Sequence, residues 1–191
     1  MPILTVDTIA QARTHAEALM RGGLMGIELT LRTPVALDAI AELKRGYPGL
    51  SVGAGTVLTP DQLRAATEAG ADFIVTPGTT AALREALATT LLPVVAGAST
   101  PSEMLELGEH GFRVAKFFPA AALGGIAMLK ALQGPLAEFS FCPTGGLAEA
   151  DAADYLALPN VACIGGSWML AESAGETTAR AARCRALVDA R

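Results

Sequence analysis

Lys116 is one of only three lysines in the chain, and it lies where a strand would bury an apolar residue. The other two, Lys44 and Lys130, fall late in amphipathic helical stretches, where an ammonium suits both solvent and the helix dipole. In the run RVAKFFPAA (113–121), period-two alternation directs Lys116 either toward the interior enclosed by the strands or toward the covering helices. Burial disfavours the ammonium, so more neutral amine is present to attack a carbonyl carbon. The position predicts Schiff-base chemistry.

A second ionisable group comes from the run GIELTLRT (26–33), in which Glu28, Thr30 and Arg32 share one strand face. A carboxylate beside the lysine would form an ion pair at rest and act as an acid/base next to an imine. Arg32 lies farther toward the carboxyl end of the strand, where it could bind a substrate carboxylate bidentately. The alternative, a structural lysine held in a buried salt-bridge network with Glu28, stays open from these two strands alone.

Two pairs of glycines follow later strand-like runs, in CPTGG (142–146) and IGGSW (164–168). Paired glycines let backbone N–H groups approach an anion closely, and a helix that begins at Ser167 would add its positive end. The sequence therefore predicts a phosphate site at these two glycine loops.

Polar and turn residues near strand ends are also candidates. Thr144 and Ser167 offer hydroxyls, although each could equally be an N-cap. Thr56 ends the run GAGTV, and Pro77 lies in VTPG, a sequence that is most often only a turn. We expect both to lie near a bound ligand.

Short apolar runs alternate with helix-like stretches along the whole chain, which is typical of a parallel sheet with crossover helices. Eight such units at intervals of roughly 20 to 25 residues favour an α/β fold with a single (β/α)8 TIM barrel. A doubly wound open sheet is the competing architecture, but its usual GxGxxG motif is missing after the first strand. The predicted strands are 3–6, 26–31, 51–57, 72–76, 92–96, 112–119, 139–143 and 161–166.

Helices between these strands often open with a hydroxyl residue, sometimes followed by proline, which is a good N-terminal signal. The signals are Asp7-Thr8, Thr33-Pro34, Thr59-Pro60, Thr79-Thr80 and Thr100-Pro101. We expect one domain over residues 1–191, ending in a helix at 174–191 whose Arg180, Arg183 and Arg185 form a solvated face.

The composition excludes several classes of function. A net charge of −5 without clustered basic residues argues against a nucleic-acid or membrane partner. Three widely spaced cysteines, Cys142, Cys163 and Cys184, are typical of reduced thiols and predict a cytoplasmic location. Neither His15 nor His110 has a carboxylate or cysteine at ligand spacing, so we expect no metal.

Six motifs taken together, in this order and spacing, resemble the 2-keto-3-deoxy-6-phosphogluconate (KDPG) and 4-hydroxy-2-oxoglutarate (KHG) aldolases. The resemblance runs over nearly the whole chain. The motifs are ELTLRT (28–33), GAGTVL (53–58), TPG (76–78), KFFPA (116–120), CPTGG (142–146) and IGGSW (164–168).

The resemblance implies a class I aldolase of the Entner-Doudoroff pathway, with no cofactor other than the covalent Schiff base. Lys116 would form the imine and Glu28 would be the general acid/base. The resemblance also implies a homotrimer and a phosphorylated keto-acid substrate. Arg32, Thr56, Pro77, Phe118 and Thr144 would bind the substrate, while Gly145, Gly146, Gly166 and Ser167 would bind its phosphate.

Two departures from the family pattern stand out. Members usually carry an N-terminal helix that plugs the bottom of the barrel, whereas here Met1 almost begins the first strand. KFFPA is often followed by glutamate, but here Ala121 follows. Neither departure touches the predicted imine chemistry.

Three other functions remain as alternatives. The 6-phosphogalactonate isomer carries the same charges and differs at one stereocentre. A non-catalytic phosphosugar-binding barrel would keep the glycine loops while Lys116 only pairs with Glu28. An isomerase or synthase of the phosphate-binding barrels would turn over phosphosugars without releasing pyruvate.

Overall fold

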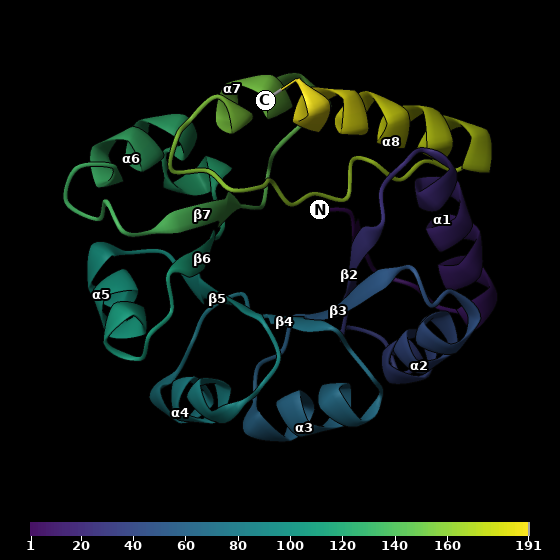
Figure 1. Ribbon diagram of the computed structural model, residues 1–191, viewed down its shortest axis with the longest axis horizontal. Coiled ribbons are helices and arrows are strands. Elements are labelled where there is room, and N and C mark those ends of the chain that lie inside the picture. The colour runs from purple at the N-terminus through teal and green to yellow at the C-terminus, as the bar shows by residue number, and fades with distance from the viewer. Residues whose placement is uncertain (191) are drawn as a thin grey trace.

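The computed structural model describes residues 1–190, so residue 191 of the expected C-terminal helix lies outside the described part. Parallel strands form one sheet in the order β1 to β7, each beside its neighbours in sequence. The sheet curls into a ring surrounded by helices (Figure 1). The strands are β1 (Ile3–Leu4), β2 (Gly26–Thr30), β3 (Ser51–Gly55), β4 (Phe73–Val75), β5 (Val94–Ala98), β6 (Val114–Phe117) and β7 (Ser140–Pro143).

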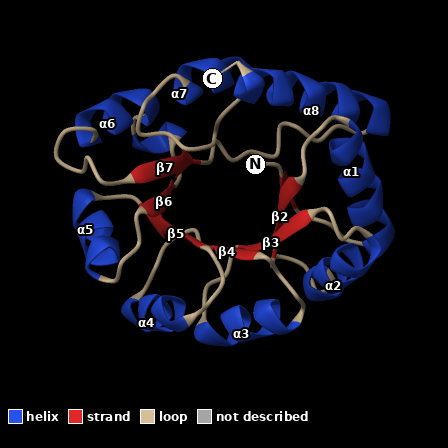
Figure 2. Cartoon of the chain, viewed as in Figure 1, coloured by secondary structure: helices blue, strands red, loops and turns tan. Residues whose placement is uncertain are grey.

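Helices follow the strands and form the outer layer of the ring (Figure 2). Short 3-10 turns at Ala121–Leu123 and Glu149–Asp151 precede two of them. The helices are α1 (Ile9–Arg21), α2 (Ala36–Gly46), α3 (Pro60–Glu68), α4 (Ala81–Thr89), α5 (Pro101–Glu109), α6 (Gly125–Leu132), α7 (Ala152–Leu156) and α8 (Ala174–Asp189). The predicted barrel architecture is confirmed.

The predicted eighth strand, 161–166, is not a regular strand but a segment held by isolated bridges. Val161 bridges to Phe141 and Gly165 to Thr144, on the β7 side. On the β1 side Gly166 bridges to Pro2, with Ile3 N donating to Gly166 O at 3.1 Å. The segment therefore spans the gap between the last and first strands, although its ladder is too sparse to make a full strand.

Four of the five predicted helix openings are N-caps. The hydroxyls of Thr8, Thr59, Thr80 and Thr100 each accept a hydrogen bond from the backbone N–H three residues on. The prediction for Thr33-Pro34 is wrong, because α2 begins at Ala36. The hydroxyl of Thr33 instead donates to Val6 O at 2.6 Å, which ties the β2–α2 loop to the end of β1.

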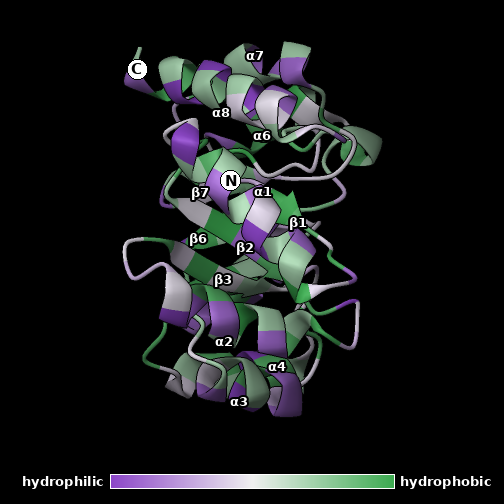
Figure 3. Cartoon of the chain, turned by 90° about the vertical axis from the view of Figure 1, so that its right-hand side faces the viewer, coloured by the Kyte–Doolittle hydropathy of each residue, from purple (hydrophilic) through white to green (hydrophobic). Residues whose placement is uncertain are grey.

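The core lies between the ring of strands and the helices. One cluster of buried apolar side chains packs around β1 to β4 and a second around β5 to β7. Ile27, Leu29, Phe117 and Phe141 are fully buried members, and burial of each such side chain contributes about 1.5–3 kcal/mol. Figure 3 shows that hydrophilic residues lie mainly on the helices.

The C-terminal helix α8 is fixed against the end of α1. A Cβ at Gly22 would lie 2.4 Å from the Cβ of Ala181, so the two helices touch where only glycine fits. Thr178 donates from its hydroxyl to Ala18 O at 3.0 Å. Within residues 1–190, no helix has both the length and the apolar character that crossing a membrane requires.

Candidate active site

Lys116 and Glu28 form a buried ion pair inside the ring of strands. Lys116 Nζ lies 3.0 Å from Glu28 Oε1, and the two side chains are 6% and 3% exposed. Lys116 comes from β6 and Glu28 from β2, 88 residues earlier in the chain. β2 and β6 are not neighbours in the sheet order, so the curling of the sheet brings the two side chains together.

Strand alternation explains why both side chains point inward. In β6, Ala115 and Phe117 are fully buried in the apolar cluster on the helix side, so Lys116 between them faces the interior. In β2, Ile27 and Leu29 occupy the same position relative to Glu28. The pattern of apolar residues thus directs the charged pair into the ring.

Glycines lie on the strands next to both members of the pair. Lys116 lies in register with Gly97 on β5. A Cβ at Gly97 would come within 2.3 Å of the backbone of Pro77, so the β4–α4 turn lies directly over this glycine. At Gly55 on β3, a Cβ would lie 2.2 Å from Glu28 Oε1. The carboxylate therefore fits only because residue 55 has no side chain.

Phe118 covers the lysine on one side. Its ring centroid lies 5.7 Å from Lys116 Nζ, close enough for the ring face to stabilise a cation there. Ser99 donates from its hydroxyl to Phe118 O at 2.6 Å. A Cβ at Gly145 would lie 3.0 Å from the ring, so Phe118 is held between this hydrogen bond and a glycine.

Arg32 and Thr56 lie together at the carboxyl ends of β2 and β3. Arg32 Nε donates to Thr56 Oγ1 at 3.2 Å, while Arg32 is exposed. Thr56 has a φ of 58°, in the left-handed region that β-branched residues rarely adopt. Such strain is concentrated at binding and catalytic sites, and here it directs the threonine hydroxyl toward Arg32.

A cavity of about 470 Å³ opens at this end of the ring. Lys116 and Glu28 are not among its lining residues and lie beneath it, with Phe118 in contact with both the cavity and the lysine. Pro77 and Thr56 are not lining residues either. The candidate residues that the structure brings to the cavity wall are Arg32, Phe118, Thr144, Gly145, Gly146, Gly166 and Ser167.

Thr144 lies at the base of this wall and is 5% exposed. Its hydroxyl donates to Cys142 O at 3.3 Å. A Cβ at Gly165 would lie 2.4 Å from the hydroxyl oxygen of Thr144. Cys142 is the register partner of Lys116 on β7. A hydrogen bond with Cys163 and burial raise the pKa of the Cys142 thiol well above its usual value, so a thiolate nucleophile beside the lysine is disfavoured.

The backbone of the two glycine loops offers N–H groups unequally. Gly166 N already donates to Met1 O at 3.2 Å, and Gly165 N to Pro143 O at 3.0 Å. Within residues 1–190, the N–H groups of Gly146 and Ser167 donate to no other residue. The expected helix at Ser167 is wrong: residues 167–170 form a turn, closed by Leu170 N donating to Ser167 O at 3.0 Å, and α8 begins only at Ala174.

Sequence reasoning missed the groups that fix the strand next to Lys116. Thr76 is fully buried at the end of β4, and its hydroxyl accepts from Gly97 N at 2.8 Å. Thr79 donates to Gly97 O at 2.9 Å, so two hydroxyls hold the backbone N–H and C=O of Gly97. Ser99, which holds Phe118, was also missed. The available signal was a hydroxyl residue directly after an apolar strand.

The arrangement suits attack by an amine on a carbonyl carbon. A lysine amine is a nucleophile once it has lost a proton, and Glu28 is within hydrogen-bond reach to accept it. Among residues 1–190 there is no group of three or more His, Cys, Asp or Glu side chains that could hold a metal ion. The lysine–carboxylate pair beneath the cavity has the groups that such an attack requires.

A ring of parallel strands surrounded by helices defines a (β/α)8 barrel, and the amine–carboxylate pair beneath an open cavity is typical of a barrel enzyme. Comparison with known proteins gives the family. The family model "KDPG and KHG aldolase" matches residues 1–184, and the chain belongs to this family of aldolases, which are lyases.

Relatives agree in sequence and in structure. The chain is 45% identical over 176 residues to the KHG/KDPG aldolase of Escherichia coli (strain K12), covering 92% of this chain and 83% of that protein. KDPG aldolase from Legionella pneumophila, solved with pyruvate captured at low pH as a covalent carbinolamine intermediate, is 41% identical with a TM-score of 0.93, over 96% and 92% of the two chains. The KDPG aldolase of Zymomonas mobilis ZM4 with 3-phosphoglycerate is 39% identical with a TM-score of 0.94, over 98% and 90%.

Proposed function

We propose that this chain cleaves 2-keto-3-deoxy-6-phosphogluconate to pyruvate and glyceraldehyde 3-phosphate through a Schiff base on Lys116. It also cleaves 4-hydroxy-2-oxoglutarate to pyruvate and glyoxylate. The observation that carries the proposal is the buried contact of 3.0 Å between Lys116 Nζ and Glu28 Oε1 beneath the cavity. The E. coli relative is a KHG/KDPG aldolase, and the L. pneumophila relative has captured pyruvate covalently, which supports the same chemistry here.

The reaction begins when the neutral amine of Lys116 attacks the C2 ketone of the substrate. Proton transfer and loss of water convert the carbinolamine to a cationic imine, which withdraws electrons from C3. The face of the Phe118 ring, 5.7 Å from the nitrogen in the resting structure, stabilises this cation.

Cleavage then requires a base for the C4 hydroxyl, and Glu28 takes that role. As the hydroxyl proton leaves, the C3–C4 bond breaks and its electron pair moves into the imine, so an aldehyde departs and an enamine of pyruvate remains. Glu28 returns the proton to C3, and water hydrolyses the resulting imine to release pyruvate and the free amine.

We assign three further residues to substrate binding because they lie at the cavity or beside the strand that carries Lys116. Arg32, oriented by Thr56, binds the carboxylate of the keto acid, because a guanidinium can donate two parallel hydrogen bonds to it. Thr144 donates to a substrate oxygen at the cavity base once its hydroxyl turns from Cys142 O. Pro77 shapes the edge of the site by covering Gly97, the strand partner of Lys116.

The phosphate of the substrate binds between the two glycine loops. Gly146 and Ser167 face this part of the cavity with N–H groups that have no other acceptor within residues 1–190, and Ser167 adds a hydroxyl. Gly145 and Gly166 contribute by letting the loops pack closely, since a Cβ at Gly145 would lie 3.0 Å from the Phe118 ring and one at Gly166 would lie 2.4 Å from the Trp168 ring. The Z. mobilis structure, which contains 3-phosphoglycerate, supports a phosphorylated ligand in this family.

Trapping with pyruvate and borohydride tests the proposal. The wild-type protein gains a reduced pyruvyl adduct on Lys116, detected by peptide mass spectrometry, and releases pyruvate from the gluconate substrate in a lactate dehydrogenase-coupled assay. Lys116→Arg gains no adduct and has no turnover. Glu28→Gln still traps pyruvate but cleaves at least about a hundredfold more slowly, as expected for loss of a general base. Full turnover by Lys116→Arg would overturn the mechanism.

The quaternary structure and location are further proposals. A homotrimer follows from resemblance to the family, and light scattering on the purified chain measures it directly. A cytoplasmic location is supported by Cys142, Cys163 and Cys184, which form no disulfide in the structure. Neither a metal nor a cofactor enters the proposed cycle, and turnover in the presence of a chelator tests that expectation.

A further inference from the structure

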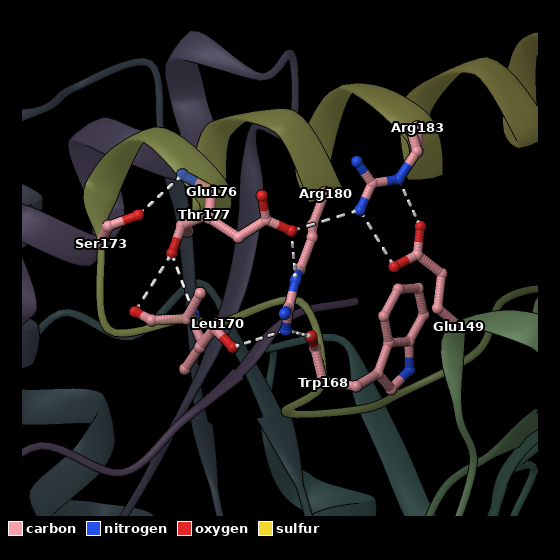
Figure 4. Close-up of polar contacts among 9 residues, drawn as sticks. Glu149, Trp168, Leu170, Ser173, Glu176, Thr177, Arg180 and Arg183 are labelled. Carbon is pink, nitrogen blue, oxygen red and sulfur yellow. Dashed lines mark hydrogen bonds and ion pairs between the residues drawn. The ribbon is translucent and has the colours of Figure 1, made fainter.

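The turn at residues 167–170 and the adjoining Ala171 lie between the cavity and the C-terminal helix. Ser167 and Leu170 line the cavity on one side of this turn. On its other side the turn faces α8, as the side chains in Figure 4 show. The turn is thus the connection between the last helix and the proposed phosphate site.

Arg180 holds this turn by its backbone. One nitrogen of its guanidinium, Nη1, donates to Trp168 O at 2.8 Å and to Leu170 O at 3.2 Å. Glu176, one helical turn earlier, accepts from Arg180 Nε at 2.9 Å and fixes the direction of the guanidinium (Figure 4). Charge-assisted hydrogen bonds of this kind are stronger than bonds between neutral groups. The expectation of a purely solvated arginine face is therefore wrong for Arg180, whose side chain is 31% exposed.

Thr177 provides a second attachment on the same face of α8. Its side chain is fully buried, and its hydroxyl accepts from Ala171 N at 3.0 Å and lies 3.4 Å from Ala171 O. Thr178 and Ala181 fix the helix to the end of α1, as described above. The turn is therefore tied to a helix that is itself immobilised.

Arg183 differs from Arg180 although it lies only three residues farther along α8. It pairs with Glu149 and with Glu176, and no hydrogen bond joins it to the described backbone of the turn. The two arginines have the same charge and both contact Glu176 (Figure 4). Arg183 is therefore a matched control for the contribution of charge.

We propose that Arg180 is a positioning residue for substrate specificity: by holding the carbonyls of Trp168 and Leu170, it fixes Ser167 at the distance from Gly146 that a phosphate requires. This inference rests on the proposed phosphate site. An anion bound between two loops is sensitive to their spacing, because binding groups must be held within about 0.5 Å of the productive geometry. Loss of Arg180 releases one loop without touching Lys116, Glu28 or Arg32.

The experiment compares a phosphorylated ligand with one that lacks phosphate in Arg180→Met, Arg183→Met and Ser167→Ala. KM and kcat are measured for the phosphorylated gluconate substrate. The pyruvate concentration that gives half-maximal borohydride trapping measures binding of a keto acid at Lys116, which involves no phosphate. Arg180→Met is expected to raise KM about tenfold with kcat nearly unchanged, as for loss of binding that is equal in ground and transition states. The pyruvate concentration for half-maximal trapping of Arg180→Met should stay within about twofold of wild type. For Arg183→Met, both this concentration and KM should stay within about twofold of wild type.

Arg180→Lys and Thr177→Val complete the set. Lysine keeps the charge and can donate to one carbonyl, so Arg180→Lys is expected to raise KM less than Arg180→Met does. Thr177→Val removes the second attachment with little change of shape and raises KM in the same selective way. Circular dichroism establishes that each variant is folded, and Thr177→Val carries the test if Arg180→Met does not fold.

The proposal is overturned if Arg180→Met weakens trapping by pyruvate as much as it raises KM, if it changes neither, or if Arg183→Met has the same effect. A selective effect of Ser167→Ala without one of Arg180→Met leaves the phosphate site intact and rejects only the positioning role. If neither variant is selective while wild-type turnover is normal, the phosphate site itself is wrongly assigned.

Discussion

The carboxylate of Glu28 occupies the space that a side chain at Gly55 would fill. A Cβ at residue 55 would lie 2.2 Å from Glu28 Oε1 and 2.5 Å from its Cγ, far inside van der Waals contact. A glycine on β3 thus determines where the proposed base on β2 can lie, and hence its contact with Lys116.

Gly55→Ala is therefore expected to displace Glu28 and lower kcat by about a hundredfold, because misplacement of a reacting group by about 1 Å has effects of that size. Steady-state turnover of the gluconate substrate measures it. Gly26→Ala is the matched control, since it lies in β2 and nothing is within 4 Å of the added Cβ. Equal kcat values for the two variants would contradict the steric argument.

Removal of one member of the buried ion pair should destabilise the fold more than removal of both. Lys116→Met leaves the Glu28 carboxylate unpaired at 3% side-chain exposure, and breaking such a pair costs about 3–5 kcal/mol. The double variant Lys116→Met/Glu28→Leu should recover most of this loss, because no buried charge remains. Urea unfolding of the single and double variants measures the free energies. A purely additive double-mutant cycle would show that the pair does not interact.

Substitutions at Arg32 and Thr56 should weaken binding of the keto-acid carboxylate. Arg32→Lys removes the planar fork, so the pyruvate concentration for half-maximal borohydride trapping should rise about tenfold. Thr56→Val keeps the β-branched shape but removes the oxygen that accepts from Arg32 Nε, and a rise of about threefold is expected. If both variants trap pyruvate at the same concentrations as wild type, Arg32 does not bind the substrate carboxylate.

Cys142 should make the protein less stable at alkaline pH. Its thiol pKa is raised in the folded state above the reference value of 9.0, first by the hydrogen bond with Cys163 and then by burial. Below the unfolded pKa both states hold the proton, and the contribution of this thiol is fully present. Above it the unfolded chain loses the proton while the folded chain keeps it, so the free energy of unfolding falls as pH rises, until the folded pKa is reached.

The variant Cys142→Ala removes this thiol together with its hydrogen bond to Cys163. Urea unfolding between about pH 7 and pH 10.5 should show a shallower decline than in wild type, with a difference of at most about 1.4 kcal/mol per pH unit for one group. Burial also raises the thiol pKa of Cys184, but that residue is present in both proteins and cancels in the comparison. Parallel declines would argue against the raised pKa.

Period-two alternation predicted that Lys116 and Glu28 share the interior of the ring, and the repeat of strand-like and helix-like runs predicted the barrel. Strand alternation at Lys116 and Glu28 depends on apolar neighbours only, and those neighbours are buried as expected. The eighth strand was predicted from the apolar run at 161–166, but backbone pairing there is limited to single bridges. Composition cannot reveal this difference, because an apolar segment is buried equally well with or without a full ladder.

Long-range contacts account for the rest of what the sequence did not predict. Thr33 looked like an N-cap, yet its hydroxyl binds Val6 O, an acceptor 27 residues away. Arg180 looked like a surface charge, yet it binds the carbonyls of a preceding turn. Local propensity favours the nearest partner, and only the packed structure shows which partner is within reach.

The bridge between Pro2 and Gly166 has a consequence for the order in which the molecule assembles. Its two sides are separated by nearly the whole chain, so the entropy cost of closing that loop is smallest once the intervening strands have paired with their neighbours. On a ribosome, β1 and β2 can emerge early, but the wall that contains Ser167 is complete only after most of the polypeptide has been made. The lysine and its carboxylate can therefore meet before the cavity above them exists.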